Sequence, residues 1–421
     1  SSDSLIRAAR HYEGSAQRLI LFSTHTCKKF IRSISSSSSL KPLCENEWAV
    51  ATSPARIDLA GGWSDTPPIT FEHGGCVTNL ALKLSGKRPV GARARVLPEP
   101  ILLLVVGNET IRCEKMADVK DHNTPHAPAA LLKCALLAIG ILDMSRSETF
   151  VEQLDRCPGL GSKGRRGLEI RSWSDLPQGS GLGTSSILAG CLVACAARAA
   201  CIELNRSEIV HAVLLAEQLL STGGGWQDQV GGIYPGAKIG KSSAKLPVFV
   251  ETKTISMPSG FHDTLGQHLV LVYTGRQRLA RNLLQNVVRR WYARVPEIVS
   301  TADALVLNAL DASHALQKGK LSEIGTCLSK YWEQKKMMAA GCEPTFVREM
   351  IDALSDMIHG ASLAGAGGGG FLILLTKEPN ATDALKKRLE SRKINLSGMK
   401  FHSVSVDMEG LSLSVVVDDE K

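Results

Sequence analysis

A run of alternating glycines between residues 177 and 186 is the feature of this sequence best suited to chemistry. It reads Pro-Gln-Gly-Ser-Gly-Leu-Gly-Thr-Ser-Ser and stands between an expected strand and an apolar helix. Glycines let a backbone approach a phosphate closely and aim N–H groups at it, and the helix that follows adds a partial positive charge. No Lys precedes the hydroxyl residues as in a Walker loop, and the glycine spacing does not fit the dinucleotide fingerprint. We therefore favour an anion-binding role over a turn that only caps the helix.

The sequence has three more glycine-rich turns, two of which carry charged side chains. Segment 56–65 couples Arg56 and Asp58 to a Gly-Gly turn that is followed by Asp65. Either carboxylate also suits a role in stabilising the turn. Segment 223–232 frames Asp228 with glycines just after a helix, and segment 364–370 clusters glycines before an apolar strand. Four such turns in one chain are hard to explain as structural punctuation alone.

The elements that must position these turns are strands and helices without strict alternation, which favours an α+β fold over a doubly wound sheet. Strands are expected at 55–59, 76–82, 89–96, 101–106, 168–173, around 249, at 269–273, at 371–375 and at the end of the chain. Helices are expected at 1–32, 128–142, 185–201, 207–220, 278–340, 344–358 and 381–390. The helix at 185–201 is apolar on nearly every face, so we expect it to be buried all round.

The N-terminal segment is expected to be an amphipathic helix followed by a flexible serine tract at 35–39. Its candidate buried positions are Ile6, Ala9, Tyr12, Leu19 and Phe22. A chain of 421 residues is too long for one ordinary core, so two domains are expected after this segment. We place the boundaries at 1–46, 47–259 and 260–421.

The composition argues against several other classes of protein. No apolar stretch reaches the ~18 residues that a membrane span requires. The net charge of +8 is dispersed, and the densest basic patch, 163–166, has no aromatic neighbours, so nucleic-acid binding is disfavoured. The eleven cysteines are odd in number and form neither a Cys-x-x-Cys pair nor a zinc-ligand spacing, which suits reduced thiols in the cytoplasm.

The four turns, in this order, resemble those of the GHMP kinases, the family of galactokinase, homoserine kinase, mevalonate kinase and phosphomevalonate kinase. The resemblance covers residues 48–421 and implies a two-domain α+β fold, with a left-handed βαβ unit in the N-terminal domain and a ferredoxin-like C-terminal domain. Segments 53–68, 273–280 and 8–14 resemble the fucokinase branch of that family. The resemblance thus implies ATP-dependent phosphorylation of L-fucose at its anomeric hydroxyl. It also implies that the chain is the kinase portion of a longer enzyme with an upstream pyrophosphorylase domain; an oligomer is possible.

The resemblance also implies a role for individual residues. Asp228 is expected to orient or deprotonate the sugar hydroxyl, and Arg56 to neutralise charge on the transferred phosphoryl group. Ser185 and Glu217 are expected to bind Mg²⁺, which prefers hard oxygen ligands. Asp65 is expected to accept hydrogen bonds from sugar hydroxyls. The residues expected at the ATP phosphates are Pro177, Gly179, Gly181, Leu182, Gly183, Thr184, Ser185, Ser186, Gly365, Gly367 and Gly368.

The nature of the sugar rests on weaker signals. Gly62 and Trp63 stand where galactokinases have a Glu-His pair, and this change would open room or offer an apolar face to the methyl group of a 6-deoxy sugar. For Glu72 and His73, a structural role near the turn is at least as good an interpretation. A kinase for another sugar or for a heptose phosphate stays open, with Arg276 or Arg278 holding the substrate's own phosphate. A ligand sensor that has lost catalysis is a third interpretation.

Overall fold

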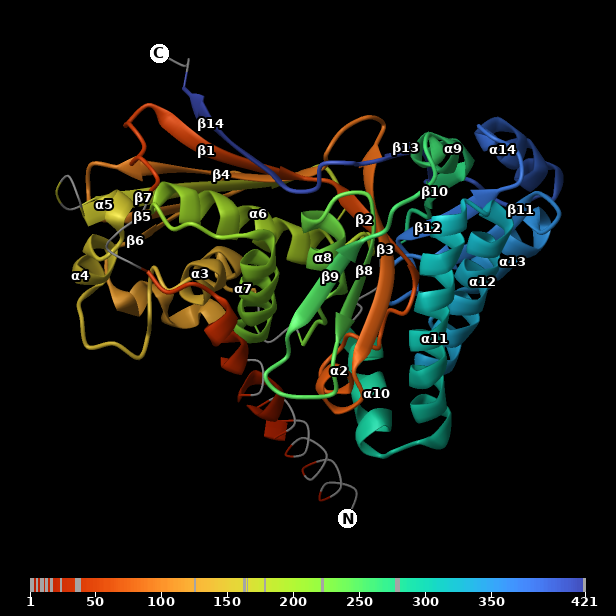
Figure 1. Cartoon of the computed structure of the whole chain (residues 1–421), viewed down its shortest axis with the longest axis horizontal. Coiled ribbons are helices and arrows are strands. Elements are labelled where there is room, and N and C mark those ends of the chain that lie inside the picture. The colour runs from red at the N-terminus through yellow and green to blue at the C-terminus, as the bar shows by residue number, and fades with distance from the viewer. Residues whose placement is uncertain are drawn as a thin grey trace.

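The computed structural model describes residues 4, 7, 11, 14–15, 18–22, 25–34, 39–124, 126–161, 164, 166–177, 179–220, 223–276 and 281–418. Within these residues the strands form one sheet of six and one of eight strands. The six-stranded sheet lies at one end of the molecule, and helices α11 and α12 lie at the other, with strands β2, β3 and β8 between them (Figure 1). The mixture of helices and strands agrees with the α+β fold that the sequence predicts.

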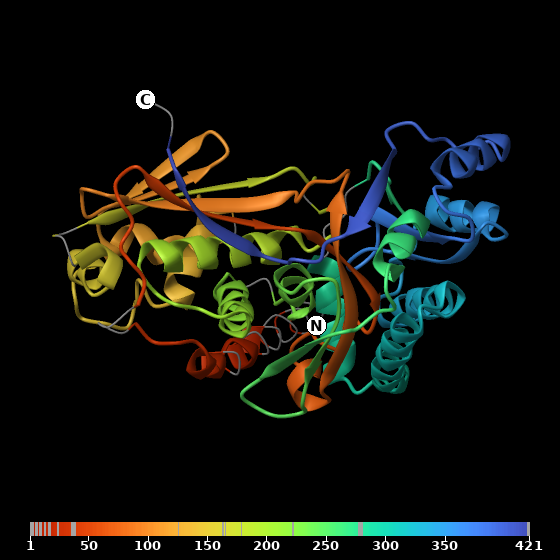
Figure 2. The ribbon, with the colours of Figure 1, turned by 45° about the horizontal axis from the view of Figure 1, so that its top comes forward.

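The six-stranded sheet has the order β14-β1-β4-β7-β5-β6. Its pairs are antiparallel except for β5 and β7, which run parallel. Helices α6, α3 and α7 pack beneath it, with α6 against β1, β4 and β7 (Figure 2). The strands are β1 (Glu47–Ser53), β4 (Val90–Leu97), β5 (Leu102–Val106), β6 (Glu109–Cys113), β7 (Gly167–Ser174) and β14 (Ser412–Val417).

The eight-stranded sheet has the order β11-β12-β10-β13-β3-β8-β9, and β2 pairs with β3 beside this path. The register of β2 and β3 sets Arg56 opposite Ala81 and Asp58 opposite Asn79. Helices α11 and α12 pack on β2, and α12 also packs on β11. The strands are β2 (Ala55–Ala60), β3 (Gly75–Leu84), β8 (Ala237–Ser242), β9 (Val250–Thr254), β10 (Leu269–Tyr273), β11 (Ile358–Leu363), β12 (Phe371–Thr376) and β13 (Lys400–Val406).

The helices fall into a group beneath the six-stranded sheet and a group around the eight-stranded one. Those of the N-terminal half are η1 (Thr26–Phe30), α2 (Ile69–Glu72), η2 (Met116–Asn123), α3 (Ala130–Ala138), α4 (Phe150–Asp155), α5 (Pro158–Gly161), α6 (Thr184–Ala199), α7 (Arg206–Leu219) and α8 (Gln227–Ile233). Those of the C-terminal half are α9 (Phe261–His268), α10 (Arg281–Tyr292), α11 (Pro296–Lys318), α12 (Leu321–Met338), α13 (Thr345–Leu354) and α14 (Thr382–Ser391). No helix in the described ranges is both long and apolar enough to cross a bilayer.

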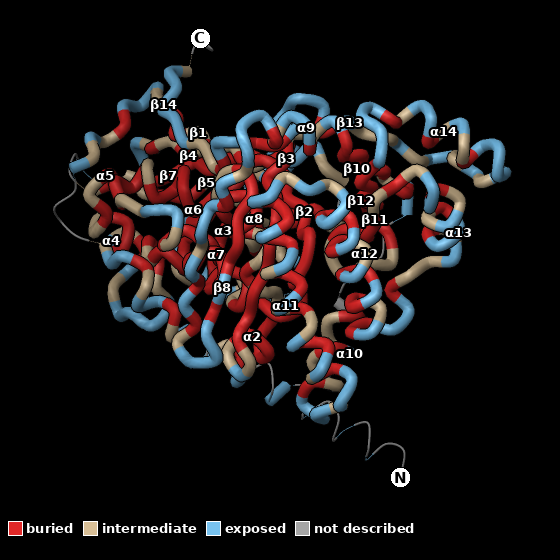
Figure 3. Tube along the Cα trace, turned by 45° about the vertical axis from the view of Figure 1, so that its right-hand side comes forward, coloured by how far each residue is buried: buried red, intermediate tan, exposed pale blue. Residues whose placement is uncertain are grey.

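Two hydrophobic cores hold the elements together. One lies between the six-stranded sheet and helices α3, α6 and α7, and the other joins β2, β3 and β10–β12 to α11, α12 and α13. Figure 3 shows these central strands as buried and the peripheral loops as exposed. The last two strands return to the first part of the chain, because β13 pairs with β3 and β14 with β1. The division of the chain at residue 260 stays a prediction.

Several expected elements differ in detail. The expected helix at 278–340 is three helices, because the chain turns at Arg294 and Gly319, both with positive φ, and Pro296 starts α11. The helix expected at 344–358 ends at Leu354, and Ile358 begins β11. The helix expected from Pro128 begins at Ala130, after Ala129 adopts a φ of +55°.

The N-terminal segment corrects two burial expectations. Its described residues between 4 and 25 are helical, but Leu19 and Phe22 are exposed and Ile20 is the buried position. Ile6, Ala9, Tyr12 and the serines at 35–38 lie outside the described residues, as does part of the basic patch at 163–166.

Candidate active site

Arg56, on β2, and Asp228, in the first turn of α8, form an ion pair at the centre of the candidate site. The Arg56 Nε donates to the Asp228 Oδ1 at 3.0 Å, and the Nη2 donates to the same oxygen. The Nη1 donates to the Gly181 carbonyl at 2.8 Å and lies 3.4 Å from the Asp58 Oδ2. One guanidinium therefore joins three of the four glycine-rich turns.

The charges of this pair are set by burial and by neighbours. Arg56 is 1% exposed, and burial alone would lower its pKa. The carboxylates of Asp228 and Asp58 outweigh burial and raise that pKa, so the guanidinium stays charged. Burial raises the pKa of Asp58, against the opposing effect of Arg56. The Asp228 side chain is 26% exposed, so this carboxylate is open to a ligand in a way that Asp58 is not.

Glycines make this close approach possible. Gly183 is the N-cap of α6 with a φ of +77°, and a Cβ there would lie 3.1 Å from the Arg56 Nε and 3.1 Å from the Asp228 Cβ. A Cβ on Gly231, within α8, would lie 2.6 Å from the Arg56 Cβ. Since real Cβ atoms rarely come so near to other atoms, both positions need glycine for packing, and the positive φ of Gly183 adds a need for backbone freedom there.

The fourth glycine-rich turn packs against the first, residues 177–186, which we call the phosphate loop after the role expected of it. A Cβ on Gly365 would lie 2.9 Å from the Gly181 Cα, and the Phe371 N–H donates to the Ser180 carbonyl at 3.1 Å. Gly367 and Gly368 lie instead against the α12–α13 connection, where the Gly368 N–H donates to the Cys342 carbonyl at 2.6 Å. The structure thus brings Gly365 to the loop, while Gly367 and Gly368 contact Cys342.

A second group of acids lies beside the ion pair. Ser186 donates a hydrogen bond to the Glu217 Oε1, and Asp65 accepts one from the Gln227 N–H at 2.9 Å. Burial raises the pKa of Glu217 to about 8, and the nearby Asp228 and Asp65 add to that rise. Burial raises the pKa of Asp65 to about 7, with Asp58 and Asp228 acting in the same direction. In the ligand-free fold both carboxyls therefore favour the protonated form more than an exposed carboxyl does.

The hydroxyl that contacts Glu217 is that of Ser186, while Ser185 is the exposed residue at the start of α6. The expectation that α6 is buried on every face therefore fails at this end, where Ser185 faces outward. Thr184 bonds to the Ser180 hydroxyl at 3.1 Å, and Leu182 is buried in the core beside it. Pro177 and Gly179 flank Gln178, which lies outside the described residues.

The space beside Gly62 is filled rather than open. A Cβ there would overlap the Tyr331 hydroxyl and the Gln227 Oε1. Trp63 is 7% exposed and packs in the core with a φ of +80°. The Gln227 Oε1 and the Asp65 Oδ1 are buried acceptors without a hydrogen-bond partner among the described residues. Two unsatisfied oxygens near each other are suited to the hydroxyl groups of a ligand.

Sequence reasoning missed the contribution of α12. Tyr331 reaches Gly62, and Lys335, one turn on, donates to the Leu363 carbonyl just before the fourth glycine turn. The ammonium also lies 4.8 Å from the centre of the Tyr331 ring. Burial lowers the pKa of Lys335 to about 8, although Asp58 favours its charged form. In the sequence, Tyr331 and Lys335 are recognisable only as two residues on the same face of a helix, and this spacing by itself does not identify a site.

Other expected residues lie outside this constellation. Glu72 accepts hydrogen bonds from the Trp291 Nε1 and from Arg294, and His73 bonds to Asp303, so both tie the turn after α2 to α10 and α11. The Arg276 guanidinium stacks 4.3 Å from the Phe346 ring centre. Arg278 lies outside the described residues, as do the others at 277–280. No cluster of three or more His, Cys, Asp or Glu side chains suited to a metal occurs in the described ranges.

The class of protein follows from family comparison. The sequence pattern of the GHMP kinases N terminal domain matches residues 148–236, which include the phosphate loop, Glu217 and Asp228. The pattern described as GHMP kinases C terminal matches residues 312–395, which include Tyr331 and the fourth glycine turn. The chain therefore belongs to the GHMP kinase family and has its two-domain α+β fold.

Individual proteins of known name that are similar to this chain include two bifunctional enzymes with a fucokinase activity in their names. The chain is 34% identical over 339 residues to a bifunctional fucokinase/GDP-fucose pyrophosphorylase of Arabidopsis thaliana, covering 80% of this chain and 30% of that protein. It is 31% identical over 364 residues to an L-fucokinase/L-fucose-1-P guanylyltransferase of Bacteroides fragilis, covering 86% of this chain and 38% of that protein. The chain thus spans about a third of the length of these curated relatives. A crystal structure of a D-glycero-D-manno-heptose 1-phosphate kinase from Bacteroides thetaiotaomicron shares the fold, with a TM-score of 0.59, 20% identity and coverage of 87% and 98%.

Proposed function

We propose that this chain transfers the γ-phosphoryl group of ATP to the anomeric hydroxyl of L-fucose, giving fucose 1-phosphate and ADP. The observation that carries the proposal is the ion pair of Arg56 and Asp228 held against the Gly181 carbonyl of the phosphate loop. The choice of L-fucose is supported by the two fucokinase relatives. Their bifunctional names also support a kinase domain that is joined to a pyrophosphorylase domain in the longer protein.

The residues beside the phosphate loop fit ATP and Mg²⁺. The loop ends at α6, whose first N–H groups and partial positive charge favour the phosphates of ATP. Glu217, with Ser186 and the exposed Ser185 near it, offers one carboxylate and hydroxyl oxygens. Such a small set suits Mg²⁺, which keeps waters and takes phosphate oxygens as its other ligands. When bound, Mg²⁺ would neutralise charge on the phosphates, and the buried Glu217 would hold it as an ionised carboxylate.

Asp228 and Arg56 act on the transferred group. Asp228 is open on one side, so it accepts or orients the proton of the anomeric hydroxyl as that oxygen bonds to the γ-phosphorus. The bond from phosphorus to the β–γ bridging oxygen then breaks, and ADP leaves with that electron pair. Arg56 stabilises the negative charge on the phosphoryl oxygens and holds Asp228 at a fixed distance from the loop.

The sugar is held by the buried acceptors. In the part of the chain that the structure describes, the Asp65 Oδ1 and the Gln227 Oε1 have no protein partner, and the two residues are linked through the Gln227 N–H. Tyr331 brings a hydroxyl to the same place from α12. Together they give hydrogen-bond acceptors and one donor to the hydroxyls of a small sugar. These three residues offer polar atoms to the sugar hydroxyls, and none of them provides a contact for the methyl group of L-fucose.

A panel of sugars with ATP tests this function. The expected result is turnover of L-fucose well above that of D-galactose, with the phosphate mapped to the anomeric oxygen. A heptose phosphate should be included in the panel, because a kinase for such a sugar is the alternative function. In that alternative Arg276 would hold the phosphate group of the substrate. Turnover of the heptose phosphate without turnover of L-fucose would refute the proposed substrate. Loss of all turnover with ATP still bound would indicate a sensor.

A further inference from the structure

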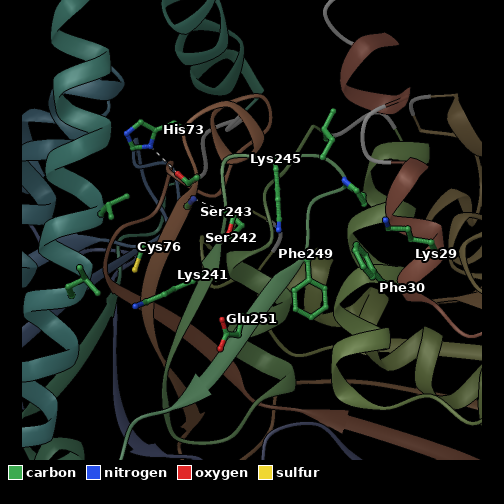
Figure 4. Close-up of a pocket in the computed structure, with 16 residues that line it drawn as sticks. Lys29, Phe30, His73, Cys76, Lys241, Ser242, Ser243, Lys245, Phe249 and Glu251 are labelled. Carbon is green, nitrogen blue, oxygen red and sulfur yellow. Dashed lines mark hydrogen bonds between the residues drawn. The ribbon is translucent and has the colours of Figure 1, made fainter.

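A second hollow lies away from the candidate active site. A cavity of about 960 Å³ opens between η1, the start of β3, the β8–β9 hairpin and α11 (Figure 4). Its volume falls in the range of small-molecule pockets. The described residues that line it do not include Arg56, Asp65 or Asp228.

One wall of the cavity is an ordered aromatic stack. Phe249 stacks on His211 with ring centres 5.3 Å apart and 19° between the planes, and the Phe30 ring meets its edge at 5.0 Å. The stack is fixed from both sides, because the Val250 N–H donates to the His211 Nε2 and the Cys27 Sγ donates to the Val248 carbonyl. Phe249 nevertheless remains 45% exposed. A flat ligand ring can therefore extend the column of His211 and Phe249 at little entropic cost.

The rest of the lining is cationic. Lys29, Lys241 and Lys245 are exposed at the rim, and within the described ranges no carboxylate lies within ion-pair distance of any of the three. The acidic lining residue, Glu251, is paired with Lys253 at 2.9 Å. Figure 4 shows Lys29 and Lys245 extending toward the side of the cavity where Phe249 lies, whereas Lys241 points away from this ring.

The floor of the cavity is preformed. The Ser242 hydroxyl accepts from the Gly75 N–H at 3.0 Å and bonds to the Thr70 hydroxyl at 2.7 Å. Thr70 in turn accepts from the Trp226 Nε1 at 2.9 Å, two residues before Asp228. A ligand therefore meets a wall that needs no rearrangement.

We propose that this cavity is a second nucleotide site, in which a base stacks on Phe249 and the phosphates bind Lys29 and Lys245. An aromatic face beside ammonium groups that have no ion-pair partner in the described part of the chain matches a flat base that carries phosphates. The site is separate from the phosphate loop, so the proposal does not depend on the sugar or on the catalytic roles given above.

Equilibrium dialysis of radiolabelled ADP against the whole chain tests the proposal by counting sites. The double variant Lys29→Glu/Lys245→Glu is expected to bind one ADP fewer per chain than the unaltered protein. Phe249→Ala is expected to weaken the same site by about tenfold or more. The matched control Lys377→Glu/Lys387→Glu makes the same charge change on exposed lysines outside the lining and should leave the number of sites unchanged.

Thermal unfolding of each variant checks that the fold is intact. Because the replaced lysines are exposed, the unfolding temperature should stay close to that of the unaltered protein. An equal number of ADP sites in the unaltered protein and in Lys29→Glu/Lys245→Glu overturns the proposal. A site lost equally in the control variant overturns it too, because the effect would then be one of overall charge.

Discussion

Gly183→Ala is the substitution whose consequence follows most directly from the geometry of the site. The new Cβ would lie 3.1 Å from the Arg56 Nε and 3.1 Å from the Asp228 Cβ, and those two side chains are already held together. Neither can retreat without loosening the ion pair. The φ of +77° adds a strain of about 1–2 kcal/mol for any residue with a Cβ.

Gly140→Ala separates these two effects. Gly140 has a φ of +76°, and a Cβ there would meet no atom within 4 Å. Both variants should therefore lose about 1–2 kcal/mol of stability in thermal or denaturant unfolding. Steady-state assays with ATP and L-fucose should show kcat lowered about 100-fold or more for Gly183→Ala, and within about twofold of the unaltered enzyme for Gly140→Ala. Equal activities in the two variants would refute the reasoning.

Three further outcomes are expected. Asp228→Asn should leave ATP affinity nearly unchanged in calorimetry while kcat falls by about 10²–10⁴-fold; unchanged turnover would remove this carboxylate from the mechanism. Tyr331→Phe should raise the KM for L-fucose about fivefold at constant KM for ATP, whereas the exposed Tyr292→Phe should change neither. Because the pKa of Glu217 is raised to about 8, Mg²⁺–ATP binding at pH 7 should release nearly one proton, seen as a dependence of the calorimetric heat on the buffer; Glu217→Gln should abolish that release.

The sign of the Glu217 shift also fixes a stability trend. The carboxyl ionises near 4.5 when exposed and near 8 in the ligand-free fold, so folding favours its protonated form. Its contribution to stability is therefore present below pH 4.5 and is lost as the pH rises towards 8. Glu217→Gln should flatten that part of a stability profile measured by denaturant unfolding.

The glycine-rich turns could be found in the sequence because their requirement is local. A glycine with positive φ before a helix, such as Gly183, is visible as a residue type at a position. The sequence also shows Gly319 and Pro296, the residues at which the helix expected at 278–340 is interrupted in the structure. The short strand β11 offered less, because its sequence from Ile358 contains His and Gly and lacks alternation.

Residues that join the site through tertiary packing could not be found in this way. Tyr331 and Lys335 lie one turn apart on α12, and only the packing of α12 on β2 decides that this face meets Gly62 and Leu363. The same limit applies to Leu19 and Phe22, whose helical spacing suggested burial that the fold does not supply. Periodicity identifies a helix face but not the partner that covers it.

The glycines of the phosphate loop are also required for close packing against neighbouring residues of the protein. The sequence argument assigns them to the close approach of a phosphate, yet Gly181 packs on the carbonyl of Ala364 and Gly183 on the side chains of Arg56 and Asp228. If phosphate approach alone required Gly183, its replacement by Ala would chiefly weaken ATP binding. Because its nearest neighbours are instead Arg56 and Asp228, which we propose to act on the transferred group, the loss should fall on kcat, with the KM for ATP changed less. Comparing the change in kcat with the change in the KM for ATP therefore shows whether the phosphates or the Arg56–Asp228 pair require glycine at position 183.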